Sequence, residues 1–172
     1  MNKKGISPLI ATVLIIGFTI VLAALVITWG NKLFQTTVED TAKSSKFALE
    51  CTSGYDAIDG VATQAVSGTY YPIIAVKLES KLTKIIPGLV FVARPPSSTT
   101  TAVRTFSTDI TTVTGATASS LTTGLNPFGA AQYSLSIGPT NTVKYKEVEV
   151  NLIVDVDGVK KVCQEGKVFP IA

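Results

Sequence analysis

Histidine is absent from this chain of 172 residues, and its only cysteines are Cys51 and Cys163. A zinc site needs several His or Cys ligands close together, and a catalytic triad needs a histidine base, so neither can be assembled here. Charged residues are also scarce, at 16% of the chain, and two of the charges that make up the net +3 belong to Lys3 and Lys4. No basic surface for nucleic acid is expected. The sequence therefore predicts no catalytic site, no cofactor, no metal site and no nucleic-acid partner.

Hydrophobic residues make up 46% of the chain, and they are concentrated in one run from Ile6 to Trp29. These 24 residues contain no ionisable side chain and would span roughly 36 Å as a helix, which is enough to cross a bilayer. Pro8 falls in the first turn, where its missing N–H costs nothing, and so marks the start of the helix. The run predicts a transmembrane helix.

The charges on either side of this run indicate its orientation. Lys3 and Lys4 precede it, and the acidic pair Glu39-Asp40 follows it. The excess of basic residues on the cytoplasmic side of membrane helices places the N-terminus in the cytoplasm and everything after Trp29 outside.

Three interpretations of the run remain open. A conventional secretory signal has an apolar region of about 7–15 residues and a small-residue cleavage site, and this run is too long for it. A permanent single-span anchor carrying an extracellular binding domain fits the same topology. In the third interpretation, a short basic leader ending at Gly5 is removed and the helix stays in the mature protein.

The third interpretation is favoured by the sequence Lys3-Lys4-Gly5 followed by ISPLIATVL. This segment resembles the N-terminal signature of archaeal type IV pilins, and the resemblance extends to Gly30. It implies cleavage between Gly5 and Ile6 by a prepilin peptidase, followed by assembly of a homopolymer by a cytoplasmic ATPase on a membrane platform. Bacterial type IV pilins usually carry glutamate at the fifth mature position, where this chain has Ile10. Archaellins, the subunits of archaeal swimming filaments, share the short leader and remain an alternative.

A helix that is apolar all round suits both lipid and the interior of a helix bundle. Once the charged leader is removed, the same surface can leave the bilayer and pack against copies of itself. The residues expected to form this filament core are Leu9, Val13, Ile16, Ile20 and Leu25.

The helical pattern continues after the apolar run. Gly30-Asn31 is a possible kink, but beyond it Phe34, Val38 and Leu49 recur at helical spacing with charged residues between them. We expect an amphipathic continuation to about Phe47. The resulting organisation is a leader at 1–5, a core helix at 6–47 and a head at 48–172.

The head is rich in Gly, Thr, Ser, Val and Tyr, and its pattern predicts strands rather than helices. The expected strands are Tyr71–Leu78, Gly88–Arg94, Ala102–Ser107, Gln132–Ile137, Tyr145–Val156 and Val159–Gln164. Short strands with such turns favour a β-sandwich or open barrel. The predicted fold class is α+β, a lollipop-shaped pilin with a long helix and an all-β head.

The sharpest local prediction is a hairpin at Asp157-Gly158, because this pair suits a two-residue turn with positive φ. In that register Asp155 faces Lys160, and Lys161 falls on the core face, which is a conflict. The aspartates at 56 and 59, like those at 155 and 157, lack the number and spacing of calcium ligands. We interpret both groups as turn residues.

Cys51 and Cys163 bracket the head. Disulfides persist in exported proteins, so we expect the two cysteines to be joined. Together the patterns predict a structural subunit of an extracellular filament, serving adhesion, which begins as a membrane-inserted precursor. A membrane-anchored binding domain is the alternative from a second class.

Overall fold

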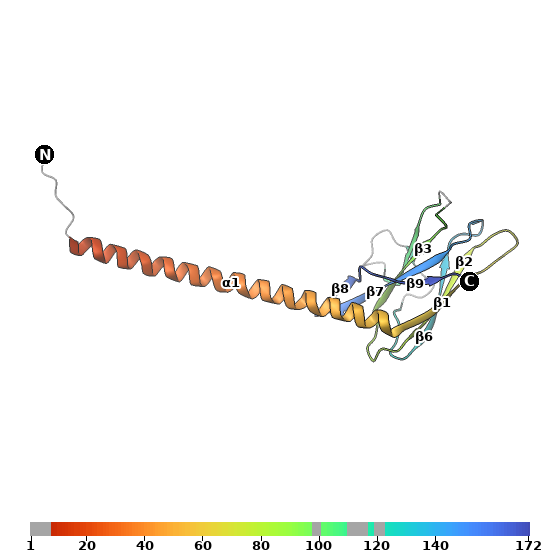
Figure 1. Cartoon of the computed structure of the whole chain (residues 1–172), viewed down its shortest axis with the longest axis horizontal. Coiled ribbons are helices and arrows are strands. Elements are labelled where there is room, and N and C mark those ends of the chain that lie inside the picture. Colours follow the sequence, from red (N-terminus) through yellow and green to blue (C-terminus); the bar gives the residue numbers. More distant parts are fainter. Residues whose placement is uncertain (1–7, 98–100, 110–116, 119–122) are drawn as a thin grey trace. The chain divides into compact units, whose positions relative to one another are not determined.

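The computed structural model describes residues 8–97, 101–109, 117–118 and 123–172. The chain divides into two compact units, Met1–Ser44 and Ser45–Ala172. Within the described residues it forms one helix, α1 (Pro8–Ala57), followed by nine strands (Figure 1). The α+β prediction is confirmed, because a long N-terminal helix precedes antiparallel sheets.

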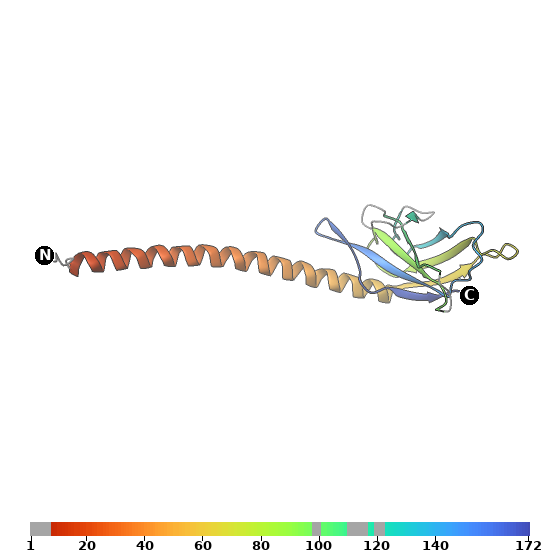
Figure 2. The ribbon, with the colours of Figure 1, turned by 90° about the horizontal axis from the view of Figure 1, so that it is seen from above.

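Helix α1 is continuous through Gly30 and Asn31, so the possible kink does not form (Figure 1, Figure 2). The helix also extends to Ala57 and does not end near Phe47. Its last turns, from Ser45 onward, belong to the same compact unit as the sheets.

Tertiary packing explains this longer helix. Cys51 is buried in the core of the head, and Phe47 and Tyr55 pack against that core. Thr52, Ser53 and Gly54 are weak helix formers, and a sequence pattern alone does not favour a helix across them. Burial of the neighbouring side chains overrides that local preference.

The strands are β1 (Ile58–Gln64), β2 (Ile73–Ser80), β3 (Gly88–Arg94), β4 (Arg104–Ser107), β5 (Thr117–Ala118), β6 (Ala130–Ser136), β7 (Glu147–Val156), β8 (Val159–Val162) and β9 (Lys167–Pro170). All six predicted strands are present as β2, β3, β4, β6, β7 and β8, and the bounds of β3 are identical to those predicted. The sequence prediction missed β1, β5 and β9.

The strands form two sheets. One has the order β1-β2-β6, and the other has the order β5-β4-β3-β7-β8 with β9 also paired to β7. All pairs are antiparallel except β4 with β5. The C-terminus links the sheets along one side, because Ile171 bridges to Ala62 of β1 directly after β9.

A single hydrophobic core lies between the two sheets, as in a β-sandwich. Phe91 of β3 and Tyr133 of β6 meet across it with ring centroids 5.0 Å apart. The other large side chains that are fully buried include Ile58, Ile74, Leu78, Leu89, Phe106, Leu135, Tyr145 and Leu152. Their burial is the main stabilising contribution to the head.

The β7–β8 hairpin has the predicted register. Asp157 and Gly158 both have positive φ, 54° and 81°, and Asp155 pairs with Lys160. The Gly158 amide also donates to the Asp155 carboxylate at 2.9 Å. The conflict at Lys161 is resolved without a register shift, because its side chain is exposed and its ammonium lies 5.9 Å from the Phe47 ring centroid.

The turn interpretation of Asp56 and of Asp59-Gly60 is wrong, because Asp56 lies in the last turn of α1 and the other two residues lie inside strand β1. Gly60 pairs with Leu78 of β2, and a Cβ at this position would lie 2.6 Å from the carbonyl oxygen of Lys77. The glycine permits close approach of the two backbones rather than a turn.

Candidate functional site

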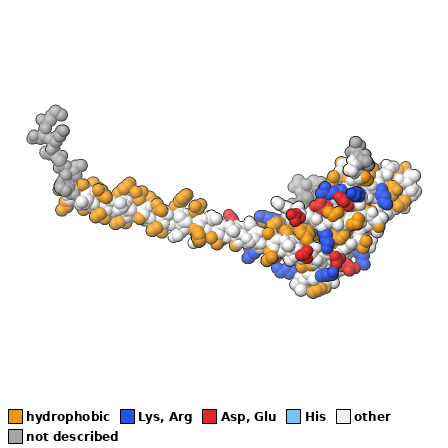
Figure 3. Space-filling view, in the orientation of Figure 1, with side chains coloured by type: hydrophobic (Ala, Val, Ile, Leu, Met, Phe, Trp, Pro, Cys, Tyr) orange, Lys and Arg blue, Asp and Glu red, His pale blue; other side chains and the backbone are white. Residues whose placement is uncertain are grey.

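The most unusual surface of this protein is the N-terminal part of α1. From Leu9 to Asn31 the helix carries no ionisable side chain, and the five residues expected in the filament core are 58–73% exposed: Leu9, Val13, Ile16, Ile20 and Leu25. Figure 3 shows hydrophobic side chains along this part of the helix on the visible face. Other large apolar side chains cover the remaining faces and are also exposed, among them Ile10, Leu14, Phe18, Val21 and Trp29.

By length and composition, α1 is the one helix among the described residues that could cross a membrane. An exposed apolar surface of this extent is typical of a segment that contacts lipid or other protein.

The threonines in this segment form hydrogen bonds within the helix. The hydroxyls of Thr12 and Thr19 each donate to the backbone carbonyl three residues earlier, both at 2.9 Å. The Thr28 hydroxyl donates to the carbonyl of Ala24 at 2.7 Å. Because these hydroxyls need no partner from outside the helix, the polar atoms do not oppose transfer into an apolar medium.

The predicted leader residues Lys3, Lys4 and Gly5, and Ile6 after the cleavage position, lie outside the described residues. The cleavage prediction therefore remains a prediction.

The predicted disulfide is present between Cys51 of α1 and Cys163, which follows β8. Their Cα atoms are 5.8 Å apart, and both residues are buried. The amide of Cys163 donates to the carbonyl of Leu152 at 2.8 Å, so the bridge ties the helix to the edge of β7.

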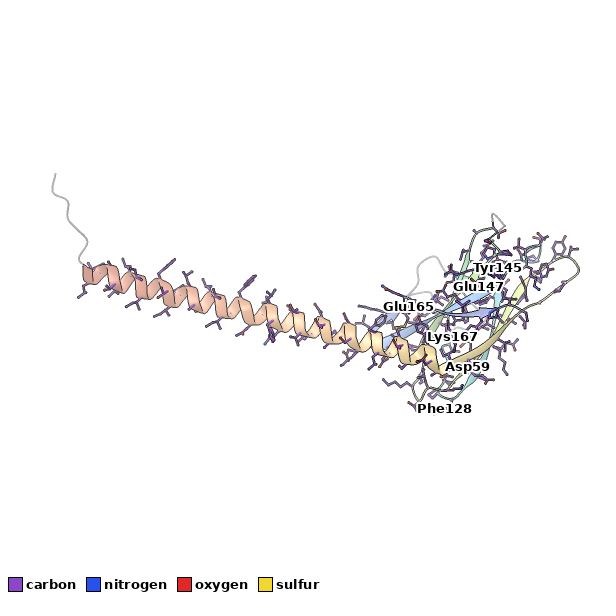
Figure 4. All side chains as sticks on the ribbon, viewed as in Figure 1. Asp59, Phe128, Tyr145, Glu147, Glu165 and Lys167 are labelled. Atoms are coloured by element: carbon purple, nitrogen blue, oxygen red, sulfur yellow. A yellow bond between two sulfur atoms is a disulfide. The ribbon has the colours of Figure 1, made fainter. Side chains whose placement is uncertain are left out.

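The C-terminal end of α1 meets three charged side chains. Lys167 of β9 lies beside Asp59 of β1 near this end (Figure 4), and its ammonium donates to the Asp59 carboxylate at 3.3 Å. Lys81 donates to the other carboxylate oxygen at 2.6 Å. The hydrogen bonds from Lys81 and then from Lys167 hold the pKa of Asp59 below its ordinary value of 3.8.

A pocket of about 510 Å³ lies beside the disulfide. Its lining residues are Phe47, Ala48, Cys51, Thr52, Tyr55, Asp56, Gln164 and Glu165. Burial, followed by the carboxylates of Glu149 and Glu165, raises the pKa of Tyr55 to about 12. Among these lining residues no nucleophile is paired with a general base, so the geometry supplies no catalytic arrangement of that kind.

The sequence did not predict the hydrogen bonds from Lys81 and Lys167 to Asp59 near the end of α1. The signals were weak, because Lys167 and Asp59 are separated by 108 positions and neither belongs to a motif. Within the described residues, no group of three or more His, Cys, Asp or Glu side chains is placed to hold a metal ion.

No protein-family model matches this chain, and no curated protein and no solved structure is significantly similar to it.

Proposed function

We propose that this chain is the structural subunit of an extracellular filament of the archaeal type IV pilus kind. The observation that carries the proposal is the helix surface from Leu9 to Asn31, which is apolar on every side, free of ionisable groups and exposed in the single chain. A surface of this kind needs an apolar medium or a set of similar helices around it.

Two further observations are consistent with a filament subunit. The sequence before the helix, Lys3-Lys4-Gly5, resembles a pilin leader and carries the two lysines that precede the apolar surface. Cleavage replaces the two lysine ammonium groups by the single α-amino group of Ile6, which leaves fewer charges to be buried when the helix end packs in a bundle, where an ammonium without a partner carries a large desolvation cost. The disulfide and the sandwich give the head a core of its own, as a subunit with one end inside a fibre requires.

The proposed partners follow from this role. The precursor lies in the membrane with a cytoplasmic N-terminus and is cut by a prepilin peptidase. A cytoplasmic ATPase on a membrane platform then adds the mature chain to a homopolymer, and the extracellular filament serves adhesion.

The test is the intact mass of subunits in purified surface fibres. We expect the mature chain to begin at Ile6, and we expect Gly5→Val to remain uncut, membrane-bound and unassembled, because the added bulk lies at the scissile bond. Asn2→Val is the matched control, since it adds a valine in the leader away from that bond, and it should be processed normally. If assembled subunits retain Met1 to Gly5, the proposed processing is wrong. If the wild-type chain stays uncut in the membrane and forms no fibres, a single-span anchor carrying a binding domain takes its place.

A further inference from the structure

Between the apolar run and Ser44, the charged residues lie along one side of α1. After the apolar run, the only ionisable side chains up to Ser44 are Lys32, Glu39, Asp40 and Lys43, and all four are exposed. At about 3.6 residues per turn, Lys32, Glu39 and Lys43 lie within about 40° of one line along the helix, with Asp40 about 80° from Lys32. We call these four residues the charged stripe.

The charged stripe has no ion pairs within its own chain among the residues that the structure describes. The next charges along the same helix differ in this respect. Lys46 pairs with Asp157 at 3.6 Å, and Glu50 pairs with Lys84 at 2.7 Å. Charges of the head thus pair with Lys46 and Glu50, whereas the two positive and two negative charges of the stripe have no such partners in the described part of the chain.

Phe34 and Val38 lie on the opposite side of the same segment, and Leu33 lies beside the stripe, about 20° from Asp40. Leu33, Phe34 and Val38 are 53%, 71% and 48% exposed. The segment therefore presents its charges on one side and apolar side chains on the other, so that each side can contact a different neighbouring helix.

The order of signs along the stripe is positive, negative, negative, positive. If two parallel copies lay side by side at the same height, each charged residue would face the same residue of the other copy, and the two charges would repel each other. A displacement of three or four residues, about 4.5–6 Å, brings Lys43 of one copy level with Asp40 or Glu39 of the other. A displacement of seven or eight residues, about 10.5–12 Å, brings Lys32 of one copy level with Glu39 or Asp40 of the other.

We infer that the charged stripe pairs with the stripe of a second, parallel copy of this chain that is displaced along the helix axis. This inference rests on the proposed function, since the common membrane orientation of the precursors makes the copies parallel. Attraction that requires a displacement favours an open, helical assembly over a closed side-by-side dimer. The apolar run supplies the affinity, and the stripe selects the axial offset between neighbours.

The experiment uses two full-length variants, in each of which two of the four stripe charges are reversed in sign. Each is produced in cells that lack the wild-type chain. The acidic variant carries Lys32→Glu and Lys43→Glu, and the basic variant carries Glu39→Lys and Asp40→Lys. Each stripe then has one sign only, so each variant alone should lose fibres that can be sheared and sedimented. Cells that produce both variants should regain fibres containing the two chains together.

The matched control is Lys144→Glu with Lys146→Glu, which changes the net charge as the acidic variant does, at exposed positions of the head. It should leave fibre yield unchanged. The amount of each variant in the membrane fraction is measured by immunoblot and should equal that of the wild type, so that loss of fibres reports assembly.

Wild-type fibre yield from either variant alone would overturn the inference, as would the absence of fibres from cells producing both. If the wild-type chain itself forms no fibres, the proposed function is wrong, and the inference that rests on it is wrong as well.

Discussion

The ammonium group of Lys167 lies 3.3 Å from the carbonyl oxygen of Tyr55, in the last turn of α1, and also donates to the carbonyl of Ile58. The final carbonyl groups of a helix have no partner within it and carry the negative end of the helix dipole. A lysine from the last strand of the chain therefore caps the helix and fixes where it ends.

We predict that Lys167→Met lowers the free energy of unfolding of a 45–172 fragment by about 1–2 kcal/mol, because the capping hydrogen bonds are lost while the apolar stem is kept. Urea unfolding measures the change. Lys144→Met, at an exposed position, is the control and should stay within about 0.5 kcal/mol of the wild type. Equal stability of the two variants would show that the cap contributes nothing.

Tyr133 makes the head sensitive to alkaline pH. It is fully buried, its hydroxyl donates to the carbonyl of Gly124 at 3.3 Å, and burial raises its pKa from 10.0 to about 12. Because the folded pKa is raised, the stabilisation is complete below pH 10 and is lost as the pH rises toward 12. On the order of 3 kcal/mol should be lost over this range from this residue.

Unfolding experiments at successive pH values test this prediction. Tyr133→Phe should reduce the dependence of stability on pH above 10, whereas Tyr70→Phe, at a position that is 41% exposed, serves as the control. An unchanged slope in Tyr133→Phe would contradict the assignment.

The disulfide should contribute strongly to the stability of the head. It closes a loop of 112 positions, for which the chain-entropy model gives about 5 kcal/mol. We expect the double variant Cys51→Ala, Cys163→Ala and the reduced wild-type chain to lose similar amounts of stability in denaturant unfolding. Mass analysis of the purified protein without reductant should show no free thiol, and detection of two free thiols would refute the bridge.

A charge in the apolar surface of α1 should abolish assembly without unfolding the head. Ile20 is 63% exposed in the single chain, and under the proposed function Ile20→Asp would place an unpaired carboxylate in lipid first and then among neighbouring helices. We expect loss of fibres with a folded, disulfide-bonded head. Ile20→Leu keeps the volume and polarity and should assemble, while normal fibre yield from Ile20→Asp would favour a simple anchor.

The long helix and most of the sheet were predictable because their signals are local. An uninterrupted apolar run defines the helix, and the Asp157-Gly158 pair fixes the hairpin through its two positive φ values. In this register the amide of Cys163 donates to the carbonyl of Leu152, which brings the cysteine beside β7.

The features that the sequence did not predict depend on residues far apart in the chain. Strand β1 was missed because Asp59-Gly60 is typical of a turn, yet Asp59 is held in the strand by Lys81 and Lys167. Strand β9 is short, and it forms because β7 offers it a free edge beside β8. The last turns of α1 form because Cys51 and Tyr55 pack on the core, which no periodicity in the sequence reports.

The position of the disulfide also decides how the head responds to mechanical force. A pull along α1 would reach β1 through Ala57 and peel that strand from the sheet, but the covalent link at Cys51 comes first and diverts the tension to Cys163, next to β7. Residues 52–162, which include eight of the nine described strands, lie inside the closed covalent loop. Stretching between α1 and the C-terminus therefore cannot extend them while the bridge is intact.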